Sequence, residues 1–230
     1  WDVTDATYRR EYLGEWVRDE NSLVYMFSKI RNLVDDLPDV DWHYALGVDL
    51  GFVDALKPYV FGADPTMGGR VEGMQTPGGT GAVRLAAALA KAAGVTRIHL
   101  GVPSWPNHAQ ILQDVGLEAV TFQHAKADGA ADIDALLQTI ADARDTDAVL
   151  LHGCCHNPSG VDYTEAQWAR IADAFADKGI LPILDVAYHG LGQGLEEDVA
   201  GVRKVLAKVP EALVAYSCDK NFGLYRDRVG

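Results

Sequence analysis

The sequence contains few cysteines, and none of them forms a CxxC pair. There are three, of which Cys154 and Cys155 are adjacent and Cys218 stands alone. Adjacent cysteines rarely form a disulfide with each other, so this content indicates a reducing compartment, which we take to be the cytoplasm.

Long apolar runs and excess positive charge are also missing. No stretch approaches the roughly 20 apolar residues that a membrane-spanning helix needs, and no signal peptide is recognisable at the N-terminus. The formal net charge of −13 disfavours nucleic acids and anionic membranes as partners. The GK[ST] signature of a P-loop is absent as well.

Length and composition indicate one large domain with a possible appendage. The chain has 230 residues, of which 48% are hydrophobic, enough for a sizeable core. In residues 1–41, aromatic and aliphatic side chains recur near helical spacing, which predicts an amphipathic helical segment. The chain begins at Trp1 without methionine and ends at Gly230 inside a motif, so we expect a fragment.

From Arg70 onwards, short apolar strands alternate with helices. We expect strands at Val71–Thr76, Arg97–Val102, Ala119–Phe122, Ala148–His152, Leu181–Val186 and Leu213–Ser217. The expected helices are Gly81–Ala93, Pro106–Val115, Asp132–Ala143 and Thr164–Lys178, after a short one at Phe52–Phe61. This alternation predicts an α/β fold with a mostly parallel sheet between helices. Ligands in such folds bind beyond the carboxyl ends of the strands.

The stretch SCDKNFGLYRDRVG follows the last expected strand and carries a lone lysine. Lys220 can form a Schiff base, and a desolvated lysine is a better nucleophile. Ser217 and Arg228 can hold a phosphate, so the combination suits pyridoxal phosphate. Taken alone, a lysine in a loop is more often a solvated surface charge.

Two further loops carry groups that suit a phosphate or an aromatic ring. In TPGGTG, Gly79 and Thr80 precede a long helix whose N-terminus can bind an anion, although a simple helix-entry turn is an equal alternative. In PSWPNH, Trp105 can stack on a ring, or it can be a packing residue.

Two more loops follow buried strands. HGCCHNPSG offers two histidines and two cysteines, but adjacent ligands on one extended segment cannot close a tetrahedral zinc site, so we expect no metal. Asn157 in this loop can donate to a ring oxygen. Asp185, at the end of LPILDV, needs a partner, either a pyridinium nitrogen or a structural cap or salt bridge.

These loops, in this order and at this spacing, resemble the class I (fold-type I) pyridoxal-phosphate-dependent aminotransferases, closest to the aspartate and aromatic amino acid group. The resemblance covers roughly residues 42–230, which would form the large cofactor-binding domain. It implies catalytic roles for Lys220, Asp185 and Tyr188, with Lys220 carrying the Schiff base and moving the substrate proton. It further implies cofactor contacts from Tyr44, Gly79, Thr80, Trp105, Asn157, Ser217 and Arg228, with His108 behind Asp185.

The resemblance also implies amino acid and 2-oxo acid substrates and a homodimer with shared active sites. It leaves four departures: an unmatched N-terminal stretch, no C-terminal small domain, His189 where glutamine is common, and Asp219 where serine is usual. A carboxylate at position 219 would repel the phosphate unless it points away or is protonated. Two alternatives therefore stay open: a truncated or degenerate non-catalytic relative, and another pyridoxal phosphate reaction such as a lyase or decarboxylase.

Overall fold

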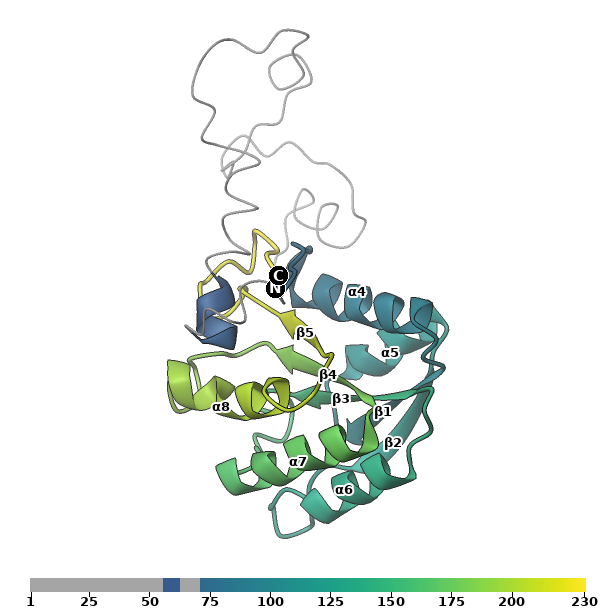
Figure 1. Cartoon of the computed structure of the whole chain (residues 1–230). Coiled ribbons are helices and arrows are strands. Elements are labelled where there is room, and N and C mark those ends of the chain that lie inside the picture. The colour runs from purple at the N-terminus through teal and green to yellow at the C-terminus, as the bar shows by residue number, and fades with distance from the viewer. Residues whose placement is uncertain (1–55, 63–70) are drawn as a thin grey trace, which may run out of the picture. The chain divides into compact units, whose positions relative to one another are not determined.

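A computed structural model describes residues 56–62 and 71–230 of the chain (Figure 1). The chain divides into two units, Trp1–His43 and Tyr44–Gly230, and every described residue belongs to the second unit. The helical segment expected in residues 1–41 lies outside the described residues, and so does Tyr44.

The centre of the second unit is a five-stranded sheet in the order β2-β1-β3-β4-β5. All of its strand pairs are parallel. The strands are β1 (Arg97–Val102), β2 (Glu118–Gln123), β3 (Asp147–His152), β4 (Leu181–Val186) and β5 (Leu213–Tyr216). The expected α/β fold with a parallel sheet is thus confirmed.

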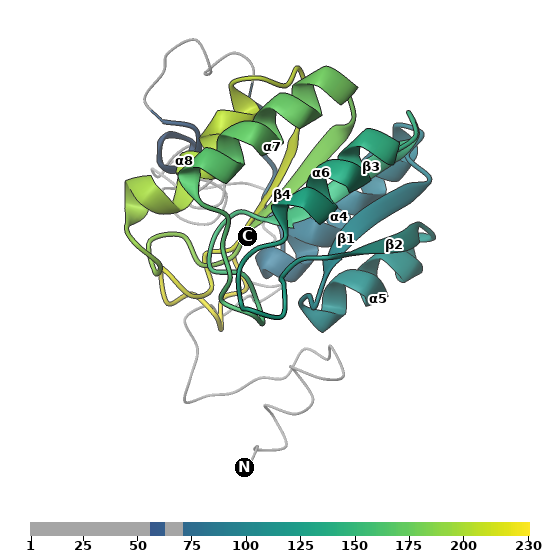
Figure 2. The ribbon, with the colours of Figure 1, turned by 90° about the horizontal axis from the view of Figure 1, so that it is seen from below.

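Helices cover both faces of this sheet (Figure 2). They are α4 (Gly78–Ala92), α5 (Pro106–Val115), α6 (Ile133–Asp142), α7 (Glu165–Lys178) and α8 (Leu195–Leu206). Successive residues of β3 point to opposite faces: Val149 and Leu151 pack in the core beneath α6, α7 and α8, whereas Ala148 and Leu150 pack with α4 and α5. A strand buried on both faces must be apolar throughout, which explains the unbroken run AVLL.

Local signals define several helix ends. At the start of α7, Thr164 accepts the backbone N–H of Gln167, and the Gln167 side chain accepts the N–H of Thr164, forming a capping box. Gly116 and Gly179 end α5 and α7 in the left-handed conformation that glycine adopts most easily. These signals are local, and the expected bounds of both helices agree with the structure within one residue.

The structure corrects three expectations about the elements. Residues 71–76 form no strand; Thr76 instead exchanges two backbone hydrogen bonds with Gly230, of 2.7 and 3.0 Å, from the far end of the sequence. Helix α4 begins at Gly78, three residues earlier than expected, and Gly78 itself has a φ of 71°, a left-handed conformation that glycine adopts easily. Helix α8 was not predicted, although Leu195, Val199 and Val202 of its sequence follow helical spacing.

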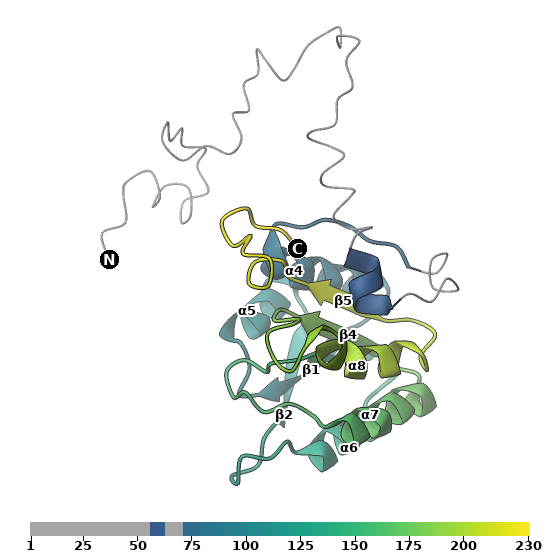
Figure 3. The same cartoon turned by 90° about the vertical axis from the view of Figure 1, so that its left-hand side faces the viewer.

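The strand order places a topological switch point between β1 and β3. The chain leaves β1 towards β2 on one side and continues from β3 towards β5 on the other. Ligands in doubly wound sheets bind at the carboxyl ends of the strands near such a point. The C-terminal segment returns beside the start of α4 (Figure 3), where Thr76 and Gly230 are hydrogen-bonded to each other. Among the described helices, none has the length and apolar character needed to cross a membrane.

Candidate functional site

A buried carboxylate lies at the carboxyl end of β4. Asp185 is 6% exposed, and its Oδ2 lies 2.8 Å from His108 Nε2 at the start of α5. His108 Nδ1 lies 2.9 Å from Ser104 Oγ, which is also 3.3 Å from His152 Nε2 at the end of β3. The carboxyl ends of three neighbouring strands, β1, β3 and β4, therefore hold one hydrogen-bonded line of side chains that fixes the orientation of Asp185.

The histidines continue this line into the protein. The rings of His108, His152, His156 and His124 follow one another with centroid distances of 5.0, 4.2 and 3.6 Å. Burial lowers the pKa of His152 to about 3, with opposition from the Asp185 carboxylate, and burial and the neighbouring His124 lower the pKa of His156 to about 3. His152 and His156 are thus neutral at physiological pH, so they act as hydrogen-bonding and packing groups.

Lys220 lies in the loop after β5, next to the tyrosine that follows β4. Its Nζ is 5.2 Å from the centre of the Tyr188 ring. The Tyr188 hydroxyl in turn accepts a hydrogen bond of 3.5 Å from Asn157 Nδ2. The side chain of Lys220 is exposed, so the desolvation expected from the sequence is not supplied by the described residues.

The N-terminus of α4 meets the loop after β5 at a cradle formed by Gly78, Gly79, Ser217, Asp219 and Arg228, which we call the α4 cradle. A Cβ atom at Gly79 would lie 2.8 Å from Ser217 Cβ, and one at Gly78 would lie 3.0 Å from both Arg228 Cζ and Asp219 Oδ2. No side chain caps α4, whose N-cap residue is Pro77. Free helix N–H groups, a hydroxyl and a guanidinium can together hold a phosphate.

The α4 cradle also contains an acidic side chain. Asp219 is 4% exposed, and its Oδ2 accepts a hydrogen bond of 3.1 Å from Arg228 Nη1. Its backbone N–H donates to Ser217 Oγ at 3.3 Å. Sequence analysis noted the unusual aspartate but missed this pairing, which joins residues nine positions apart in a loop without regular structure.

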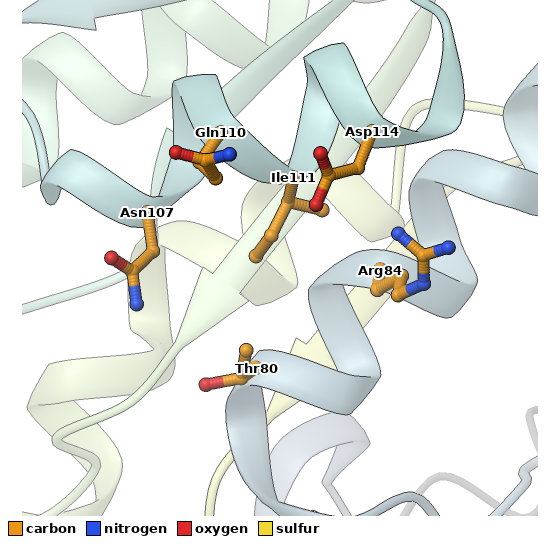
Figure 4. Close-up of a pocket in the computed structure, with 6 residues that line it drawn as sticks. All are labelled: Thr80, Arg84, Asn107, Gln110, Ile111 and Asp114. Atoms are coloured by element: carbon orange, nitrogen blue, oxygen red, sulfur yellow. The ribbon is translucent and has the colours of Figure 1, made fainter. Parts of the chain in front are cut away.

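An open cavity of about 610 Å³ lies between α4 and α5, beside the α4 cradle (Figure 4). It is lined by Thr80, Arg84, Asn107, Gln110, Ile111 and Asp114. Thr80 follows Gly79 directly in the first turn of α4, so its hydroxyl faces this cavity at the edge of the cradle.

The adjacent cysteines approach a third possible metal ligand. Sγ atoms of Cys154 and Cys155 and a carboxylate oxygen of Asp198 lie within 4.8 Å of one another. However, Asp198 already accepts three backbone N–H groups from residues 190–193. Burial raises the pKa of both thiols, which opposes the thiolate form that a metal needs. The described residues therefore give little support to a metal at this cluster.

Two residues near the site have structural contacts that the sequence did not reveal. Ser104 was given no functional role from the sequence, yet it joins two histidines; its spacing of four residues from His108, across the start of a helix, was the available signal. His189 is fully buried, with Nδ1 2.9 Å from the Tyr216 hydroxyl and Nε2 2.7 Å from the Leu195 carbonyl oxygen. It thus connects β5 to the start of α8.

The residues present fit pyridoxal phosphate at both of its ends. The α4 cradle has the glycines, hydroxyl and guanidinium that a phosphate needs, and a side chain at Gly79 would overlap Ser217. Asp185 is an oriented carboxylate suited to a pyridinium nitrogen, and Lys220 offers an amine nearby. Asp219 is the one member of the α4 cradle whose charge opposes a phosphate.

Comparisons with known proteins agree with this geometry. Residues 50–230 match the model of the family "Aminotransferase class I and II". A tyrosine aminotransferase of Rhizobium meliloti is 50% identical over 183 residues, which is 79% of this chain and 47% of the relative. An aspartate aminotransferase of Escherichia coli is 47% identical over 163 residues, which is 70% of this chain and 41% of the relative.

A solved structure shares the fold. The aromatic amino acid aminotransferase of Burkholderia pseudomallei, covalently bound to pyridoxal phosphate, aligns with a TM-score of 0.75 and 33% identity, over 79% of this chain and 46% of that one. The chain spans less than half the length of these relatives. With most of its length matched by the family model, the chain belongs to the class I and II aminotransferase family.

Proposed function

We propose that this chain is the cofactor-binding part of a pyridoxal-phosphate-dependent aminotransferase that exchanges an amino group between an aspartate or aromatic amino acid and a 2-oxo acid. The observation that carries the proposal is the convergence of the Asp185–His108 pair, Lys220 and the α4 cradle at one edge of the sheet. We further propose a homodimer, as the resemblance implies, and a cytoplasmic location, supported by three free cysteines.

In this proposal the α4 cradle would hold the cofactor phosphate, and Asp185, oriented by His108, would pair with the pyridine nitrogen. When bound, pyridoxal phosphate would withdraw electrons from the substrate Cα and make its proton acidic. Asn157 and Tyr188 would donate towards the ring hydroxyl. Trp105, which packs edge-on against His108 at 5.1 Å, would stack on the ring.

Lys220 would carry out the proton transfer. Its amine would hold the cofactor and would accept the proton that leaves the substrate Cα. The exposure of Lys220 in the described residues leaves its amine accessible to cofactor and substrate. The centre of the Tyr188 ring lies 5.2 Å from Lys220 Nζ, which is within the range of a cation–π contact.

The test is to reduce the protein with borohydride in the presence of pyridoxal phosphate and to map the modified peptide by mass spectrometry. We expect a pyridoxyl adduct on Lys220 and none in Lys220→Ala. Lys178→Ala is the matched control, because Lys178 ends α7 at the opposite edge of the sheet and donates to the Ala141 carbonyl oxygen. Amino-group transfer by Lys220→Ala at the wild-type rate would contradict the assigned role.

A second candidate function is a non-catalytic relative that keeps the fold and binds the cofactor weakly. The specific observation in its favour is the ion pair between Asp219 and Arg228 within the α4 cradle. An adduct on Lys220 without any acceptor-dependent formation of 2-oxo acid would favour this candidate. Carbon dioxide or ammonia release without an acceptor would instead favour a decarboxylase or lyase.

A further inference from the structure

We propose that Asp219 is a built-in competitor of the cofactor phosphate for Arg228, and that it sets how weakly this chain holds its cofactor. This inference rests on the proposed function, since it concerns the same α4 cradle. It assigns to Asp219 a role in cofactor affinity, separate from the chemistry at Lys220.

The Asp219 carboxylate is buried, and only one of its two oxygens has a partner among the described residues. Its side chain is 3% exposed, and one oxygen, Oδ2, pairs with Arg228 Nη1 at 3.1 Å. The other oxygen, Oδ1, is buried and has no hydrogen-bond partner among the described residues. A buried carboxylate oxygen without a partner is costly, so the carboxylate is held mainly by its single pairing with Arg228.

The guanidinium of Arg228 is already paired with Asp219. Asp219 is its one ion-pair partner within residues 56–62 and 71–230, and its other charge contact is the Tyr225 ring, 5.6 Å from Cζ. Arg228 has a φ of 53°, a left-handed conformation that is uncommon for residues other than glycine. The backbone is thus held in an unusual conformation that places the guanidinium in the α4 cradle, where the carboxylate already occupies it.

The Asp219–Arg228 pair lies close to the start of α4. A Cβ atom at Gly78 would lie 3.0 Å from Arg228 Cζ, from Arg228 Nη2 and from Asp219 Oδ2. A phosphate that contacts both the helix N-terminus and the guanidinium therefore lies next to the carboxylate. Two anions at that distance repel each other strongly where water is excluded.

The net charge of the α4 cradle also predicts that Asp219 weakens phosphate binding. With Asp219 ionised, its charge cancels that of Arg228, and a phosphate dianion meets a pair of side chains with no net charge. Replacing the carboxylate by a neutral group restores one positive charge and frees the guanidinium for bidentate contact with phosphate. Affinity for phosphate-bearing ligands should rise, whereas affinity for the same ring without a phosphate should not.

The experiment compares the wild-type 230-residue chain with Asp219→Asn, Asp219→Ser and the control Asp227→Asn. Asp227 belongs to the same loop and its change removes the same charge, but its side chain is exposed and is screened by solvent and salt. Dissociation constants are measured for pyridoxal phosphate, pyridoxal and inorganic phosphate by absorbance and calorimetry at fixed ionic strength. Circular dichroism verifies that each variant is folded.

We expect both Asp219 variants to bind pyridoxal phosphate and inorganic phosphate at least about tenfold more tightly than wild type, with pyridoxal changed less than about twofold. Asp227→Asn should match wild type. Unchanged phosphate affinity in a folded Asp219 variant would overturn the inference, as would equal tightening of pyridoxal. If no protein binds pyridoxal phosphate but the Asp219 variants bind inorganic phosphate more tightly, the proposed function fails and this inference stands.

Discussion

At the scale of single residues, Asp147 is a buried carboxylate with several hydrogen-bond partners. Asp147, at the start of β3, is 1% exposed. It accepts hydrogen bonds from Arg97 at 2.9 and 2.5 Å, from the Arg144 backbone at 2.9 Å, and lies 2.9 Å from His99 Nε2. Burial opposes its ionisation, but the hydrogen bonds from Arg97, Arg144 and His99 outweigh it and hold its pKa well below the usual range.

We predict that Asp147→Ala lowers the free energy of unfolding by about 1.5–3 kcal/mol, because the half-buried Arg97 guanidinium and the Arg144 N–H lose a charged hydrogen-bond acceptor. Asp134→Ala is the control: Asp134 pairs with Lys126 and Arg170 at 3.7 and 3.6 Å, but its side chain is 72% exposed. Its loss should cost less than about 1 kcal/mol. Urea denaturation measures both, and equal losses would show that burial does not govern the strength of these pairs.

At the scale of elements, α7 and α8 pack closely through a glycine. An ideal Cβ at Gly201 of α8 would lie 2.4–2.5 Å from ring atoms of Trp168 in α7. Trp168 is 5% exposed, so its ring has little freedom to move away. The glycine therefore allows the two helices to approach each other over the same face of the sheet.

We predict that Gly201→Ala destabilises the protein, although alanine favours a helix over glycine by about 1 kcal/mol. The overlap with the Trp168 ring costs about 1–3 kcal/mol or more, which outweighs the helix propensity. Adding Trp168→Phe should recover part of the loss by making room for the methyl group. Thermal unfolding of the single and double variants gives the coupling free energy between Trp168 and Gly201. A Gly201→Ala protein that is more stable than wild type would contradict the predicted overlap.

At the scale of the whole molecule, the stacked histidines join loops that follow β2 and β3 to the Asp185 site. Burial, together with neighbouring histidines, lowers the pKa of His152 and His156 to about 3, and burial lowers the pKa of His124. In the unfolded chain these groups have a pKa near 6.5. Between these values the unfolded state binds more protons than the folded state, so acid favours unfolding.

We predict that stability is unaffected by these histidines above about pH 7 and falls as the pH decreases from about 6.5 towards 3, by up to about 1.4 kcal/mol per pH unit for each histidine. His156→Phe keeps an aromatic ring against His124 but binds no proton. The slope of the unfolding free energy between pH 6.5 and 4.5 should therefore be smaller in this variant. Urea denaturation at several pH values measures this slope, and an identical slope in both proteins would refute the prediction.

Local sequence patterns predicted the fold class, the order of most elements and the family. Strand alternation, capping residues and turn glycines act over a few positions, so the bounds of β1, α5 and β4 follow from local sequence alone. The order of the loops around Asn157, Asp185 and Lys220 predicted a common edge of the sheet, because parallel strands end together.

The tertiary structure alone decided which of these groups are paired. The Asp219–Arg228 ion pair, the line from Ser104 to the buried histidines, and the hydrogen bonds between Thr76 and Gly230 join residues with no shared local pattern. Residues 71–76 form no strand, and the backbone of Thr76 pairs with Gly230 of the C-terminal segment instead of a neighbouring strand. The energy of each pairing depends on the distance between the two groups and on their burial in the fold. Spacing along the chain specifies neither of these quantities.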